Sequence, residues 1–143
     1  MIGTVAVGTD GSETAAKAVS AALELAERYG AALVVLSAFN GRSGAPAAPR
    51  LAPPAHPEWA SNAAEQVERI LAAAEESAAE RGIECSTAMA EGDPGEVLVE
   101  LAERHGADVL VVGSKGMERR LLGSVPNTVT HKAPCSVLVV KTA

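Results

Sequence analysis

Five short apolar segments recur along the chain, and longer stretches with a helical hydrophobic period separate them. The apolar segments are residues 4–8, 32–39, 83–90, 108–112 and 136–140. The segment at 32–39 shows why a strand is expected, because it has no three- or four-residue spacing and is too short for a buried helix. Runs this apolar are typical of a sheet that is covered on both faces.

The first helix is the most clearly marked one. Between residues 13 and 28, apolar side chains recur every three or four positions and form a single stripe. Ser12 stands where an N-cap is needed, and Gly30 follows as a stop signal. This stretch therefore predicts an amphipathic helix with one buried face.

Three further helices are predicted downstream. An Ala- and Glu-rich helix extends from about residue 58 to 81. Asp93 followed by Pro94 is a strong start signal for a helix that ends near His105. A last helix begins near Ser124. The resulting order βαβαβαβαβ predicts an α/β fold with a mostly parallel, doubly wound sheet, right-handed crossovers and helices on both faces.

The segment between the second strand and the second helix has a different composition. Residues 40–57 contain five prolines and two glycines, so they predict an exposed loop rather than a helix or a central strand. A loop of this length is either a spacer or a lid over a site, and both interpretations stay open. With 143 residues and no repeat, the chain is expected to form one domain over residues 1–143.

Composition narrows the class of function. Acidic residues outnumber basic ones by 18 to 12, a net charge of −6, which argues against a general nucleic-acid or anionic-membrane role. No apolar run is long enough to span a bilayer, and no export signal is evident, so we expect a cytoplasmic protein. Cys85 and Cys135 have no zinc-site spacing and are expected to be reduced, partly buried thiols.

Two predicted strands end in segments suited to binding an anion. The first strand ends in Thr9-Asp10-Gly11-Ser12, and the fourth in Gly113-Ser114-Lys115-Gly116, with Gly123-Ser124 opening the next helix. Glycines let backbone N–H groups approach a phosphate, and a helix N-terminus adds unpaired donors and a favourable dipole. The spacing is neither a Walker pattern nor a dinucleotide fingerprint.

A shared ligand would also fix the topology. In open parallel sheets, ligands bind outside the carboxyl ends of the strands, where the strand order reverses. The first and fourth strands must then be neighbours, which gives the order 3-2-1-4-5. Cys85 and Cys135 would lie on opposite edges of this sheet, too far apart to form a disulfide.

The glycine-containing segments, together with Leu122-Gly123-Ser124-Val125-Pro126-Asn127 and Ala133-Pro134-Cys135 before the last strand, resemble the universal stress proteins. The resemblance covers essentially the whole chain. It implies a five-stranded Rossmann-like fold, a homodimer and a role in stress response. It also implies, for a subset of members, ATP binding through GxxG, nine residues, and then Gly-Ser or Gly-Thr.

Carried onto this chain, the resemblance assigns Asp10 to the ribose or adenine and the backbone at Ala38 to the adenine edge. The phosphates would lie between the segment around Gly113 and the start of the helix at Ser124. The full set of candidate nucleotide-binding residues is Thr9, Asp10, Ala38, Val112, Gly113, Lys115, Gly116, Gly123, Ser124 and Val125. Here six residues, not nine, separate Gly116 from Gly123, so a weaker hold on the outer phosphates is predicted.

Other functions remain as alternatives. Asp10 and Ser124 would serve as helix caps in a member that binds no nucleotide and acts through protein contacts. A ligand of ATP, AMP or cyclic AMP is expected otherwise, with Mg²⁺ as a companion of ATP. No catalytic residue or metal-ligand set is evident, so at most slow ATP hydrolysis is expected. The exposed apolar edge at residues 136–141 predicts the homodimer interface, with Val139 as the residue to replace in a test.

Overall fold

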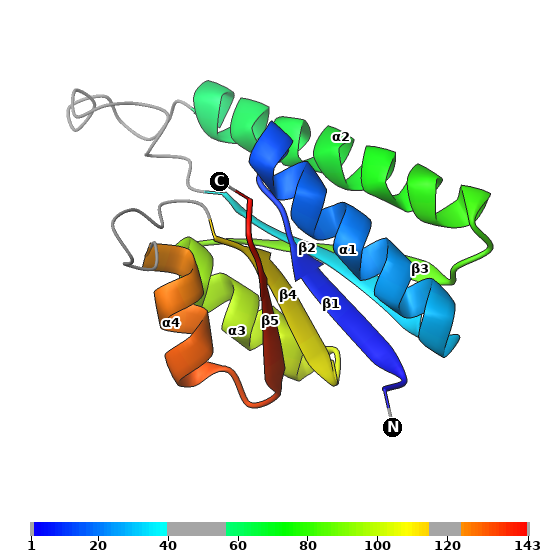
Figure 1. Cartoon of the computed structure of the whole chain (residues 1–143). Coiled ribbons are helices and arrows are strands. Elements are labelled where there is room, and N and C mark those ends of the chain that lie inside the picture. The colour runs from blue at the N-terminus through cyan, green and yellow to red at the C-terminus, as the bar shows by residue number, and fades with distance from the viewer. Residues whose placement is uncertain (1, 40–56, 115–123, 143) are drawn as a thin grey trace.

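The computed structural model describes residues 2–39, 57–114 and 124–142. Strands and helices alternate along the described chain, as Figure 1 shows. The elements are β1 (Thr4–Gly8), α1 (Glu13–Tyr29), β2 (Ala32–Phe39), α2 (Pro57–Glu80), β3 (Cys85–Glu91), α3 (Pro94–Arg104), β4 (Val109–Gly113), α4 (Ser124–Lys132) and β5 (Ser136–Val140). The predicted Pro-rich loop at 40–57, and with it the lid interpretation, lies outside the described residues except for Pro57, which begins α2.

The strands form one sheet with the order β3-β2-β1-β4-β5, and every neighbouring pair is parallel. This confirms the predicted topology. Cys85 begins β3 at one edge, whereas Cys135 immediately precedes β5 at the other, and both are free. Burial raises the pKa of the Cys85 thiol to about 11, so this group stays protonated at neutral pH.

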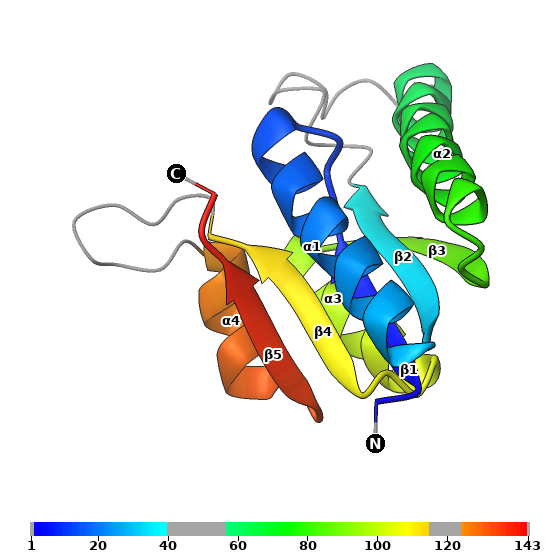
Figure 2. The ribbon, with the colours of Figure 1, turned by 45° about the vertical axis from the view of Figure 1, so that its right-hand side comes forward.

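Helices cover both faces of the sheet, α1 and α2 on one side and α3 and α4 on the other (Figure 2). On β1, Val5 and Val7 pack into the α1–α2 core, whereas Ala6 packs into the α3–α4 core. All three side chains are fully buried, as expected for the central strand of a two-faced sheet. Because all the strands are parallel, their carboxyl ends lie along the same edge of the sheet.

The predicted caps of the first and third helices are confirmed. Ser12 Oγ accepts a hydrogen bond from Ala15 N at 3.1 Å, and Asp93 caps α3 by accepting from Glu96 N at 3.1 Å. Since Ser12 fills the cap of α1, the alternative that Asp10 caps this helix is wrong. Asp10 instead accepts from Ser12 N at 2.9 Å, within the turn that leads into α1.

Two strands begin and end later than the sequence predicts, β3 at Cys85–Glu91 instead of 83–90 and β4 at Val109–Gly113 instead of 108–112. β3 begins at Cys85 rather than at Ile83, because Ile83 N donates to Ala78 O and closes the end of α2. β4 begins at Val109 because the Asp108 carboxylate accepts from the amides of Gly3 and Thr4 and belongs to the connection before the strand. In the described part of the chain, no helix is long and apolar enough to cross a membrane.

Candidate functional site

A cavity of about 390 Å³ opens where β1 and β4 end side by side at the centre of the sheet. Its volume falls in the range of small-molecule sites. The lining residues are Gly8, Thr9, Asp10, Thr14, Ala15, Ala38, Pro94, Leu98, Val112, Gly113, Ser124, Val125, Pro126 and Thr142. Open parallel sheets bind their ligands at this position, outside the carboxyl ends of the strands.

The structure brings most of the predicted nucleotide-binding residues together around this cavity. Those that line it are Thr9, Asp10, Ala38, Val112, Gly113, Ser124 and Val125. The remaining predicted residues, Lys115, Gly116 and Gly123, lie outside the described part of the chain. The prediction missed the lining residues Gly8, Thr14, Ala15, Pro94, Leu98, Pro126 and Thr142. Several of these belong to first turns of helices, so the cap signals at Ser12 and Asp93 could have located them.

The turn after β1 is held rigidly at the cavity wall. Thr9 N donates to Leu36 O at 3.0 Å, and Thr9 O accepts from the buried Ser37 hydroxyl at 2.6 Å. Gly11 N donates to Thr9 Oγ1 at 3.1 Å. These bonds tie the backbone before the exposed Asp10 to the neighbouring strand β2, while the Asp10 carboxylate accepts from Ser12 N in its own turn.

Three helix N-termini meet at the cavity. Its wall includes Thr14 and Ala15 from the first turn of α1, Pro94 from the start of α3, and Ser124 with its neighbours from the start of α4. Each helix start presents the positive end of a helix dipole. Ala15 N and Glu96 N already donate to the caps Ser12 and Asp93, so the donors open to a ligand are the first-turn N–H groups that these caps do not use. Asp10 is the one ionisable side chain among the described lining residues. The arrangement favours an anionic ligand that is held by the backbone.

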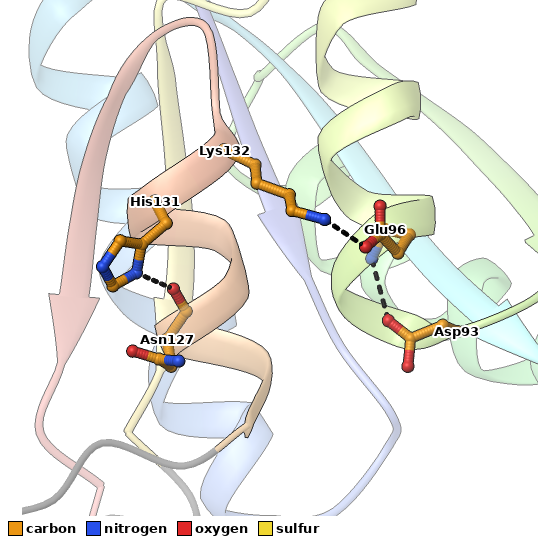
Figure 3. Close-up of polar contacts among 5 residues, drawn as sticks. All are labelled: Asp93, Glu96, Asn127, His131 and Lys132. Atoms are coloured by element: carbon orange, nitrogen blue, oxygen red, sulfur yellow. Dashed lines mark hydrogen bonds and ion pairs between the residues drawn. The ribbon is translucent and has the colours of Figure 1, made fainter.

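Helices α3 and α4 pack very closely where they border the cavity. Gly95 in the first turn of α3 is buried, and a Cβ at this position would lie 2.7 Å from Thr128 Cβ in α4. Lys132 Nζ donates to Glu96 Oε2 at 2.6 Å, and this bond raises the pKa of Lys132 (Figure 3). The close contact at Gly95 sets the distance between α3 and α4. The ion pair is exposed, so it contributes little to the stability of the protein and mainly orients the two helices.

The two described histidines lie on or next to helices, away from the cavity lining. His131 Nδ1 lies 2.8 Å from the carbonyl oxygen of Asn127 in its own helix, as Figure 3 shows, and His105 follows the last turn of α3. Neither residue lines the cavity. Among the described residues, no group of three His, Cys, Asp or Glu side chains is arranged to hold a metal ion.

Comparison with known proteins identifies the family. The sequence model of the universal stress protein family matches residues 1–141. A universal stress protein of Mycobacterium tuberculosis is 36% identical over 144 residues, which cover 97% of this chain and 96% of the relative. The chain belongs to the universal stress protein family. The universal stress protein YxiE of Bacillus subtilis is 33% identical over 150 residues, which cover 99% of this chain and all of the relative.

A solved structure of a universal stress protein has the same fold as this chain. A universal stress protein in complex with cAMP is 33% identical to this chain and superimposes with a TM-score of 0.75. The match covers 99% of this chain and 98% of that protein. In that relative, the ligand is an adenine nucleotide with a single phosphate.

The edge strand β5 of this universal stress protein shows that Val139 is the wrong residue to replace in a test of the predicted interface. Val137 and Val139 on β5 pack against the α3–α4 core, whereas Leu138 is 41% exposed. Replacing Val139 with Lys would therefore place a charge against the core and disturb folding as well as any contact at the edge. Leu138 is the suitable position for testing an interface along this strand.

Proposed function

We propose that this protein binds an adenine nucleotide in the cavity between β1 and β4 and acts through binding rather than turnover. The observation that carries the proposal is the convergence of three helix N-termini on one cavity with largely apolar walls. The cAMP complex of a relative with 33% identity supports an adenine nucleotide as the anion. We place its action in the cytoplasm, as a regulator in a stress response.

In this proposal, each part of the nucleotide would contact a different group of the cavity. Asp10 would hold the ribose, and the backbone at Ala38 would contact the adenine edge. The phosphate would lie between Gly113 and the first turn of α4, where Ser124 offers a hydroxyl and backbone N–H groups. By the motif, Lys115, Gly116 and Gly123 would complete this phosphate site. Asp10 is the sole carboxylate of the described lining, so Mg²⁺ would arrive with ATP rather than in a protein site of its own.

The shortened motif predicts little discrimination between nucleotides. An inner phosphate can reach the helix N-termini, whereas outer phosphates gain only screened attraction to basic side chains. The affinities for AMP, cAMP and ATP should therefore differ by less than about tenfold, equivalent to about 1.4 kcal/mol. Calorimetric titration of each nucleotide at two salt concentrations measures this directly. A hundredfold preference for ATP would contradict the predicted loss of outer-phosphate contacts, and heatless titrations with all three would contradict nucleotide binding itself.

The same proposal includes a homodimer that forms through β5. This strand is an edge of the sheet, and Leu138 is one of two large apolar side chains exposed in the described residues. Pairing with a second copy would cover both the unpaired backbone groups and this side chain.

Replacing Leu138 with Lys should convert the dimer to monomer, because the like charges of two copies would meet at the interface. Light scattering measures the mass of the protein in solution and so distinguishes a dimer from a monomer. The control is Tyr29→Lys, which removes the other exposed large apolar side chain, 58% exposed at the end of α1 and far along the chain from β5. The control should remain dimeric. A dimer that survives the Leu138 substitution would place the interface elsewhere.

A further inference from the structure

A buried hydrogen-bonded pair joins the end of β4 to the segment after β5. Ser114, which directly follows β4, is 1% exposed, and Thr142 is 4% exposed. Ser114 N donates to Val140 O at 2.9 Å, while Ser114 Oγ accepts from Thr142 N at 3.0 Å. The two hydroxyls lie 3.4 Å apart. The chain after β5 is thus closed onto the end of β4.

The pair also touches the cavity wall. Thr142 lines the cavity beside Gly113, and a Cβ at Gly113 would lie 3.0 Å from Thr142 Cγ2. The methyl group of Thr142 therefore packs directly against the Gly113 backbone. On its other side, Thr142 O lies 3.5 Å from Lys17 Nζ of α1. Thr142 connects α1, β4 and the chain after β5 at one edge of the cavity.

We propose that Ser114 and Thr142 are positioning residues that hold the Gly113 backbone in place to receive the phosphate of the nucleotide. The inference rests on the proposed function and deepens it. Backbone groups bind an anion well only when they are already fixed in the bound geometry, because ordering them on binding lowers the affinity. The Ser114–Thr142 pair supplies this order from one edge of the cavity.

The position of the pair predicts which part of the ligand depends on it. Gly113 lies on the proposed phosphate side, whereas Asp10 and Ala38, proposed to hold adenosine, are fixed through the β1–β2 side of the sheet. Loosening Ser114 and Thr142 should weaken AMP and leave adenosine nearly unchanged. A purely structural role would instead lower the melting temperature and weaken both ligands alike.

The decisive experiment compares AMP and adenosine binding by calorimetry in Ser114→Ala. This change leaves Thr142 N without its buried acceptor, so we expect AMP affinity to fall by about tenfold and adenosine affinity by less than about threefold. The matched control is Ser77→Ala, which removes an exposed hydroxyl that donates to Ala73 O in α2. This control should bind both ligands like the unmodified protein.

A second pair of variants keeps the test independent of the folding of Ser114→Ala. Thr142→Val retains the methyl contact but removes the hydroxyl, and should weaken AMP selectively. Thr142→Ser retains the hydroxyl and should bind AMP more tightly than Thr142→Val. Equal losses for AMP and adenosine, or unchanged AMP binding in both Ser114→Ala and Thr142→Val, would overturn the inference. Failure of the unmodified protein to bind either ligand would overturn the proposed function, and the inference with it.

Discussion

Replacing Ser124 with Asp should lower the affinity for AMP by about a hundredfold, because two negative charges at close range oppose each other by a few kcal/mol even near a protein surface. Ser124 is the first residue of α4, is exposed, and lines the cavity on the proposed phosphate side. An acidic residue at a helix start interacts favourably with the helix dipole. The melting temperature of the variant should therefore stay the same or rise while binding is lost.

The opposite directions of the two effects make this substitution informative. Ser124→Asn has nearly the same size and shape as the Asp variant but no charge, so it should retain most of the AMP affinity. Calorimetric titration and thermal unfolding of both variants separate charge from shape and binding from stability. AMP binding of normal strength in Ser124→Asp would mean that the phosphate does not lie at the start of α4.

Replacing Gly95 with Ala should destabilise the protein by about 1 to 3 kcal/mol through overpacking. The new Cβ would lie 2.7 Å from Cβ and 2.8 Å from Cγ2 of Thr128, so α3 and α4 must move apart. In an uncrowded helix the same change stabilises by up to about 1 kcal/mol. Because α4 carries Ser124 and Val125, its displacement should also weaken AMP binding.

A double-mutant cycle tests the cause of this loss. Thr128→Gly removes the side chain that the new methyl group meets, so Gly95→Ala should cease to be destabilising in that background. Chemical denaturation gives the free energy of unfolding for the four proteins. A Gly95→Ala variant that is more stable than the unmodified protein would show that the two helices can adjust without cost.

The sequence was sufficient for the order of strands and helices along the chain because its local signals agree with one another, whereas the strand order in the sheet followed from the ligand expected between the first and fourth strands. Ser12 and Asp93 cap the helices that they precede, and the apolar segments became the strands of the sheet. Ile83 was misplaced because an apolar residue after a helix can close that helix as well as begin a strand. The hydrogen bond from Ile83 N to Ala78 O assigns this residue to the end of α2, and that bond cannot be predicted from the residue type.

The candidate site was predictable only where its residues stand in continuous motifs. Asp10 follows a strand, Gly113 ends one and Ser124 opens a helix in recognisable segments, and all three line the cavity. Thr142 has no such signal, since its partner Ser114 lies 28 positions earlier and the contact exists only because β4 and β5 are neighbours. Residues that support a site through pairing of distant segments require the structure.

Nuclear magnetic resonance of the ¹⁵N-labelled protein, titrated with AMP, tests the central claim most directly, because it reports both binding and its place. The account predicts that the largest amide shift changes occur at Thr9, Ala38, Gly113 and Val125, around the cavity between β1 and β4. The groove between α1 and α2 shares Thr9 with the cavity, so its far end at Ser20 and Arg81 serves as the internal reference and should remain unchanged. Shift changes concentrated in that groove, or none anywhere at millimolar AMP, would contradict the account.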